Sequence, residues 1–201
     1  MTGLGWSQGS APVRRRGPEL ERAILDAALE QLGAGGWSSV TMEGVAAGAR
    51  TGKAALYRRW SSKADLVAEA LCEGLPELGG IADHGSVRED LYRLCARMRD
   101  VMHSPAGEAL RAVLHECDHA HADRFREVIW KGLHEPAHRL IRELVDRGIE
   151  RGDVRPDATS PMVIEVIPAM LMYRTKVCGS EWPDSEIAEM IDGLVVPMLR
   201  V

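Results

Sequence analysis

The sequence predicts an all-α protein, on three observations. Good helix formers such as Ala, Leu, Glu and Arg are plentiful among the 201 residues, whereas there is one Phe and only three Tyr, which is poor material for strands. Apolar residues recur at helical spacing through most of the chain, and no segment shows the alternation of a half-buried strand. We therefore expect two helical domains, a small N-terminal one and a larger C-terminal one.

The N-terminal segment predicts a tail followed by a first helix. Residues 1–17 are rich in Gly, Ser and Pro and contain the cluster Arg14–Arg16, so we expect a flexible basic tail. The cluster either stays in solvent or follows a DNA minor groove as an arm. Pro18 suits the first position of a helix, and the glycines between Gly33 and Gly36 end it.

Two shorter helices and a fourth one follow. Thr41 is a good N-cap for a helix over residues 42–48. A third helix covers about residues 52–59, and the segment Ser62–Asp65 has the spacing of a capping box that opens a fourth helix.

Caps, glycines and prolines delimit the helices of the second half. Ser86 opens one with a capping box, and Pro105 ends it. Pro136 should kink or divide a long helix, because it lacks a backbone donor and crowds the preceding turn. The expected helices cover about residues 87–104, 106–117, 123–151, 161–177 and 184 onward.

Charge and cysteine usage narrow the class of protein. The net charge is −5, yet residues 1–70 carry nine Lys and Arg against seven Asp and Glu, so they hold +2 and the remainder −7. A basic end on an acidic body suits local contact with phosphate. The cysteines at 72, 95, 117 and 178 form no CxxC pair, which favours reduced thiols over a disulfide frame or a zinc ribbon.

Nothing in the sequence marks the chain for a membrane or for export. No apolar run approaches the roughly 18 residues of a membrane span, and the first residues have no stretch of signal-peptide length. We expect a cytoplasmic protein without a membrane partner.

The segment 41–60 is typical of a helix-turn-helix that reads DNA, since two short helices are joined by about three residues and the second is basic. One helix fits the major groove, so its N-terminal half faces the bases: Thr51, Gly52, Lys53, Ala54 and Ala55. Donors for phosphates follow at the rim: Tyr57, Arg58, Arg59 and Lys63. The alternative is the core of a small helical bundle built on Val45, Leu56, Trp60 and Leu66, and both interpretations can hold together.

The string TMEGVAAGARTGKAALYRRWSSKADL resembles the N-terminal DNA-binding region of the TetR family of regulators, over about residues 19–71. The resemblance implies a recognition helix at 52–59 and phosphate contacts from Thr41, Tyr57 and Lys63. It also implies a DNA-binding domain over 18–71 and an effector-binding and dimerisation domain over 72–201. The expected function is a ligand-responsive regulator, a repressor that binds a palindromic operator in double-stranded DNA as a homodimer and is released by a small-molecule effector.

Three positions depart from the family pattern. Arg50 replaces the usual Gly, Thr51 a small aliphatic residue, and Ala55 a hydroxyl residue. A non-Gly residue in a left-handed helix end costs on the order of 1 kcal/mol. Either Gly48 absorbs the bend instead, or Arg50 adds a DNA contact.

The last two helices predict the dimer interface. The final helix carries an apolar stripe, and the helix before it is apolar nearly all round, so two copies could bury both in a four-helix bundle. The alternative is that both helices complete the core of one chain. The candidate interface residues are Met162, Val166, Met170, Ile187, Met190, Ile191, Leu194, Val195 and Met198.

An effector pocket, which the resemblance implies, should lie between the helices of residues 87–177. Each candidate lining residue could instead be ordinary core or surface. The candidates are His103, Trp130, His134, Glu165, Met170 and Tyr173.

Two further motifs suggest enzymes and are weaker. His115, Glu116 and His119 match HExxH, the pattern of zinc hydrolases, with His121 and Asp123 as candidate third ligands. A solvated helix end is the simpler interpretation, and a zinc-binding or hydrolytic protein is kept as the alternative. Residues 47–54 resemble a phosphate loop, but the first Gly, the final Ser or Thr and the preceding strand are missing. We expect no enzyme, metal or cofactor.

Overall fold

The computed structural model describes residues 17–116 and 119–200, without the side chains of residues 115 and 119–122. The predicted basic tail with Arg14–Arg16 lies outside this range. Helices account for all regular structure in the described residues, which confirms the predicted fold class. In chain order they are α1 (Pro18–Ser39), α2 (Met42–Gly48), α3 (Lys53–Tyr57), α4 (Lys63–Gly74), α5 (Val87–Met102), α6 (Pro105–Glu116), α7 (His119–Ile129), the π-helical turn η1 (Trp130–His134), α8 (Glu135–Arg151), α9 (Pro161–Lys176), α10 (Asp184–Met190), the π-helical turn η2 (Ile191–Val195) and α11 (Val196–Leu199).

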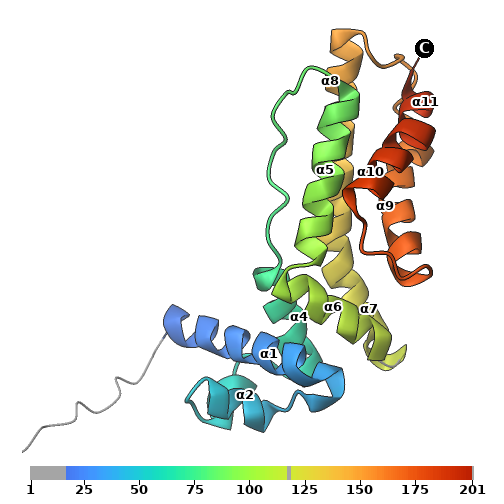
Figure 1. Ribbon diagram of the computed structural model, residues 1–201. Coiled ribbons are helices and arrows are strands. Elements are labelled where there is room, and N and C mark those ends of the chain that lie inside the picture. Colours follow the sequence, from blue (N-terminus) through green and yellow to red (C-terminus); the bar gives the residue numbers. More distant parts are fainter. Residues whose placement is uncertain (1–16, 117–118, 201) are drawn as a thin grey trace, which may run out of the picture.

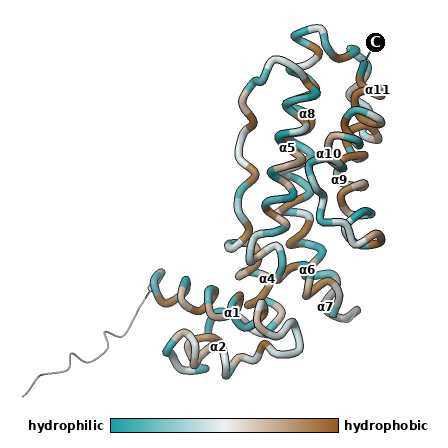
Figure 2. The backbone as a smooth tube through the Cα atoms, in the orientation of Figure 1, coloured by the Kyte–Doolittle hydropathy of each residue, from teal (hydrophilic) through white to brown (hydrophobic). Residues whose placement is uncertain are grey.

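The helices form an upright bundle standing on a smaller base (Figure 1). The bundle contains α5, α8, α9 and α10, and α1 and α2 belong to the base. The base joins the bundle mainly through packing of α1 on α4 and α6. The domain boundary expected after residue 71 falls inside α4, which runs to Gly74. Hydrophobic and hydrophilic turns alternate along the bundle helices (Figure 2), as expected for helices with one face in a core. None of the described helices is both long and apolar enough to cross a membrane.

Local signals in the base act as the sequence predicts. The helical conformation of α1 breaks at Gly35 and Gly36, and Gly36 has a φ of 70° that favours glycine. The Thr41 hydroxyl accepts a hydrogen bond from the Gly44 N–H, and the Ser62 hydroxyl accepts one from the Asp65 N–H. Both side chains therefore act as the expected N-caps.

Each π-helical turn ends two residues before a proline. Pro136 follows η1, and Pro197 follows η2. A proline lacks the backbone donor for the carbonyl four residues earlier, and its ring crowds that carbonyl, so widening the preceding turn relieves both problems. The expected disturbance at Pro136 is a π-helical turn between α7 and α8.

A buried carboxylate fixes the connection between α4 and α5. Asp90 is fully buried in α5 and lies 3.0 Å from the Arg151 guanidinium. It also accepts a hydrogen bond of 2.8 Å from the His84 N–H, while Arg147 donates to the Ile81 carbonyl. Removing one partner of such a buried pair leaves an uncompensated charge, so this cluster ties the extended segment firmly to α5 and α8.

The turn after α2 is built on Arg50 itself. Arg50 has a φ of 54°, whereas Gly48 remains helical, so the expectation that Gly48 absorbs the bend is wrong. The Thr51 N–H donates to the Ala46 carbonyl at 2.9 Å and the Arg50 N–H to the Ala47 carbonyl at 3.0 Å. These two bonds form a Schellman motif, in which the left-handed residue is usually glycine.

The residues predicted for the dimer interface fall into two sets that differ in burial. Ile187, Met190, Ile191 and Val195 are buried in the core of the single chain, so they have almost no area left for a partner. For these four the alternative of a core within one chain is correct, because the stripe of the last helix faces its own bundle. Met162 and Leu194 remain exposed, and Val166, Met170 and Met198 are half-buried.

Replacing Arg50 by glycine should stabilise the protein. The substitution relieves the left-handed strain, so we expect Arg50→Gly to raise the free energy of unfolding by about 1 kcal/mol. Arg50→Ala keeps the Cβ atom and should change little. Urea unfolding at one fixed protein concentration measures the difference.

Ala47→Gly is the matched control, because it puts glycine inside the same helix, where it should cost about 1 kcal/mol. Equal stability of the Gly and Ala variants at position 50 would show that the left-handed conformation carries no cost.

Candidate nucleic-acid interface

Buried residues on one side of α3 fix its exposed side in place. Leu56 is fully buried and Trp60 nearly so, and the Trp60 indole N–H donates to the Glu69 carboxylate at 2.9 Å. A helix of only one turn is thereby held rigidly against α4, although it is too short to be stable alone.

The predicted DNA-binding residues surround this anchored turn. All of them lie at the surface, and none is part of the buried core. Those that are exposed are Thr41, Arg50, Gly52, Lys53, Ala54, Tyr57, Arg58 and Arg59, and those that are half-buried are Thr51, Ala55 and Lys63. Tyr57 is the most prominent aromatic of the base, with 54% of its surface exposed.

The cap residue Thr41 keeps a free donor. Its hydroxyl oxygen accepts the Gly44 N–H at 3.0 Å, and a hydroxyl has its own proton besides. Thr41 can therefore stabilise α2 and donate outward at the same time.

Two of the cations near α3 are paired with carboxylates. Lys53 forms an ion pair with Glu43 of α2, and Arg59 lies 2.6 Å from Glu21 of α1. The hydrogen bond from Lys53 lowers the pKa of the Glu43 carboxyl. Both pairs are solvated, so each is worth little and can exchange for another anion.

Lys63 is directed toward the protein. Its ammonium group donates to the Trp37 carbonyl at 2.9 Å and lies 4.0 Å from the centre of the Trp37 ring. Partial burial lowers the pKa of Lys63, and the nearby Glu116 carboxylate acts in the opposite direction. A phosphate contact from this residue would require the side chain to turn outward.

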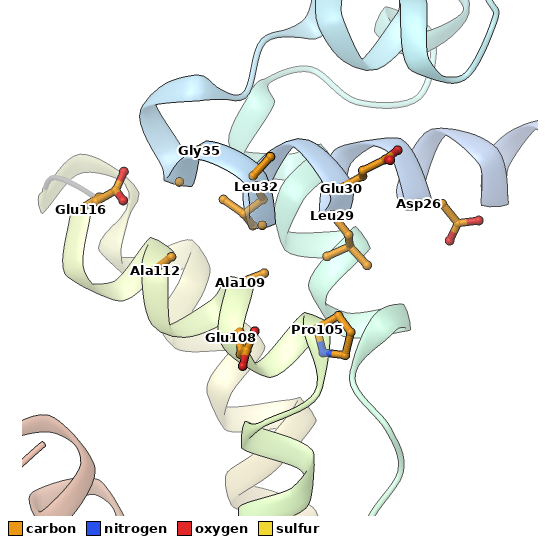
Figure 3. A pocket seen from close by; sticks show the side chains of 13 residues that line it. Asp26, Leu29, Glu30, Leu32, Gly35, Pro105, Glu108, Ala109, Ala112 and Glu116 are labelled. Atoms are coloured by element: carbon orange, nitrogen blue, oxygen red, sulfur yellow. The ribbon is translucent and has the colours of Figure 1, made fainter. Parts of the chain in front are cut away.

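An acidic hollow of about 490 Å³ lies beside the contact between α1 and α6 (Figure 3). Asp26 and Glu30 line it from α1, and Glu108 and Glu116 from α6. Glu116 accepts a hydrogen bond of 3.3 Å from the Ser38 N–H, so it joins the end of α6 to the base. The sequence contained no signal for this hollow, because its two walls are far apart in the chain.

A second cavity, of about 330 Å³, lies within the bundle between α5, α6, α8 and α9. Of the six residues predicted for an effector pocket, His134 and Glu165 line this cavity, and His103 lines a small void beside it. Trp130, Met170 and Tyr173 line neither space, and Trp130 instead stacks on His134 with 4.3 Å between ring centres. Sequence reasoning missed further polar lining residues: Arg111, Thr175 and Lys176 of the main cavity, and Arg99, Ser180, Glu181 and Trp182 of the small void.

The HExxH motif is only partly visible. The side chains of His115, His119 and His121 lie outside the described residues, and Glu116 binds Ser38. Within the described part of the chain, no group of three His, Cys, Asp or Glu residues is placed to hold a metal ion.

Known proteins resemble this chain along most of its length. A family model described as bacterial regulatory proteins, tetR family, matches residues 24–70, and one described as tetracyclin repressor-like, C-terminal domain, matches residues 81–194. An uncharacterised HTH-type transcriptional regulator of Mycobacterium tuberculosis is 29% identical over 180 residues, which cover 89% of this chain and 87% of that protein. A DNA-binding transcriptional repressor TetR of Mycobacteroides abscessus is 26% identical over 186 residues, 92% of this chain and 96% of the relative.

The fold agrees with these matches. The crystal structure of a TetR family transcription regulator superposes with a TM-score of 0.63 and 23% identity, over 88% of this chain and 97% of the other. The C-terminal model alone spans more than half of the chain. Because the family consists of regulators, the hydrolase alternative is set aside. The chain belongs to the TetR family and is a DNA-binding transcriptional regulator.

Proposed function

We propose that the protein represses transcription by binding a palindromic operator as a homodimer, and that a small-molecule effector releases it. The observation that carries the DNA-binding part is the exposed set of hydroxyl and cationic side chains around α3, anchored from below by Leu56 and Trp60. A short, rigidly held helix with a polar outer side fits the major groove.

The first half of α3 reads bases in this proposal. Lys53 is the long donor of the reading face and suits the acceptors of guanine. Ala54 and Ala55 let the helix approach closely and can contact a thymine methyl group. Arg50 and Thr51 lie in the strained turn just before the helix, where they can reach the neighbouring base or phosphate.

Phosphate contacts fix the register of the helix on the duplex. Thr41 and Tyr57 donate from hydroxyl groups, while Arg58 and Arg59 supply charge. Lys63 either turns outward from Trp37 to join them or holds the α1–α2 connection in place.

A stripe on α9 is the proposed dimer surface. Met162, Val166, Met170, Tyr173 and Val177 follow one another at spacings of three or four residues, so they share one side of the helix. Of these, Met162 is 72% exposed. The last helical segments run beside α9 (Figure 1) and add Leu194 and Met198. Two copies that bury this surface would form an isologous interface with two-fold symmetry.

The route from effector to DNA runs through α6 in this proposal. Leu110 and Leu114 of α6 line the bundle cavity, and Glu116 of the same helix binds Ser38 of the base. A ligand that fills the cavity and favours another position of α6 would therefore move the base, and with it the spacing of the two recognition helices.

Selection of genomic fragments by the purified protein tests the proposed operator. We expect the enriched fragments to share an inverted repeat whose half-sites are about one DNA turn or a multiple of it apart. Lys53→Met should weaken the enrichment strongly, and Lys131→Met, at an exposed lysine of η1, should preserve it. No enriched sequence, or a site without symmetry, would contradict the proposal.

Freeing Lys53 should strengthen binding. Glu43→Gln removes the carboxylate that holds Lys53 and a negative charge that would face DNA, so we expect operator affinity to rise about threefold or more. Fluorescence anisotropy at fixed salt measures it, with Glu150→Gln on α8 as the control. The gain should shrink in a Lys53→Met background; an undiminished gain would mean that Glu43 acts only by repelling DNA.

A charge on the α9 surface should separate the dimer. We expect Met162→Glu combined with Leu194→Glu to give folded monomers that bind the operator at least tenfold more weakly, because each half-site is then held alone. Light scattering after gel filtration gives the mass, and Ala82→Glu in the α4–α5 connection is the control. A double variant that remains dimeric would place the interface elsewhere.

A further inference from the structure

The bundle cavity has the composition of a site for a mostly apolar molecule. Its volume of about 330 Å³ is at the lower end of the range of small-molecule sites. At roughly 30 Å³ for each water-sized group, it holds a body of about ten non-hydrogen atoms. The side chains that line it are mainly aliphatic or thioether groups, such as Met98, Met102, Leu110, Leu114, Leu133 and Met172.

Arg111 is an underpaired cation in this apolar wall. Its side chain is only 25% exposed, and the nearest carboxylate oxygen, on Glu108, lies 3.9 Å away, beyond hydrogen-bonding distance. The described part of the chain offers its guanidinium no hydrogen bond. A guanidinium has five donors and no acceptor, so a largely buried one without partners leaves room for an anion.

Trp182 adds a second unused donor at the same end. It is 3% exposed, and its indole N–H has no acceptor among the described residues. It lines the small void that shares Met102, Arg111, Leu171 and Thr175 with the main cavity. Trp182 also has a φ of 56°, a strained conformation for a bulky residue.

We propose that the cavity binds an amphipathic carboxylate, with its apolar body between α5, α6, α8 and α9 and its carboxylate on Arg111. The carboxylate would accept two hydrogen bonds from the guanidinium, as this planar group favours, and others from the Trp182 indole and the Thr175 hydroxyl. The proposed function supplies the regulatory role of this ligand, whereas the ligand class rests on the cavity alone.

The end of the cavity at Glu165, opposite Arg111, does not favour a cationic group on the ligand. Glu165 is half exposed there, 4.0 Å from the His138 ring nitrogen. It is ten residues before Thr175 on α9, about 15 Å along the helix axis. Solvent and His138 can satisfy this carboxylate, whereas at the Arg111 end the buried Trp182 indole N–H has no acceptor among the described residues.

Decanoate and 1-decanol are matched probes for this proposal. Both have a ten-carbon chain, and the hydrophobic effect alone would make the neutral alcohol bind at least as well as the anion. We expect isothermal titration calorimetry with the full chain, free of DNA, to give a Kd for decanoate about tenfold or more below that for decanol. Decylamine should bind more weakly than either.

Two variants identify the groups responsible. Arg111→Met keeps much of the side-chain length but removes charge and donors, so the preference for decanoate should fall to about one. Trp182→Phe keeps a buried aromatic ring and loses the indole N–H with the smaller ring, so the preference should fall in part. Arg142→Met, at an exposed arginine of α8, should leave it unchanged. Equal binding of the two probes by the unmodified chain, or a preference that survives Arg111→Met, would overturn the proposal.

The test of the ligand class can succeed or fail independently of the test of the proposed function. Fragment selection without an enriched operator, together with a decanoate preference that depends on Arg111, would remove the regulatory role and leave the ligand class standing. An enriched operator, together with equal affinity for decanoate and decanol, would leave the regulator standing and remove the ligand class.

Discussion

The packing of α6 on α1 is the contact on which the rest of the molecule depends. Small residues of α6, Ala109 and Ala112, line the same hollow as Leu29 and Leu32 of α1 (Figure 3), and small side chains let the two helices approach closely. Glu116 closes the joint by accepting the Ser38 N–H just after the break in α1. The base contains α2 and α3, so this joint, together with the packing of α4 on α6 and α7, determines where the proposed DNA-facing turn lies.

The same joint explains how a cavity in the bundle can affect a distant turn. Arg111 is five residues before Glu116 on α6, about 7.5 Å along the axis. The proposed ligand on Arg111 would therefore act on a helix whose next turn and a half is attached to the base. Packed helices shift between discrete arrangements more readily than they deform, so in the proposed mechanism a small displacement at the cavity would be passed on as a movement of α1.

Sequence reasoning succeeded where the signal is local and failed where it depends on distant partners. The caps at Thr41 and Ser62 could be predicted because each needs only the next three residues. The choice between Gly48 and Arg50 as the residue at which the chain bends could not be predicted, since either residue can end α2. Periodicity located the apolar stripe of the last helix, but it cannot say whether Ile187 faces its own bundle or a second chain. Arg111 carried no signal because its cavity is assembled from four separate helices.

The ion pairs of the base make DNA binding an exchange rather than a simple attraction. In the proposed complex, Lys53 and Arg59 would leave Glu43 and Glu21 in order to meet DNA, and the body of the chain carries an excess of negative charge. Solvated pairs contribute about 0–1 kcal/mol each, which phosphates can replace, although the net gain per contact is smaller than for a free cation. Non-specific affinity, which comes almost entirely from phosphate contacts, is thereby reduced. A larger share of the discrimination then falls on the bases that α3 reads, which suits a regulator that has to leave most of a genome unoccupied.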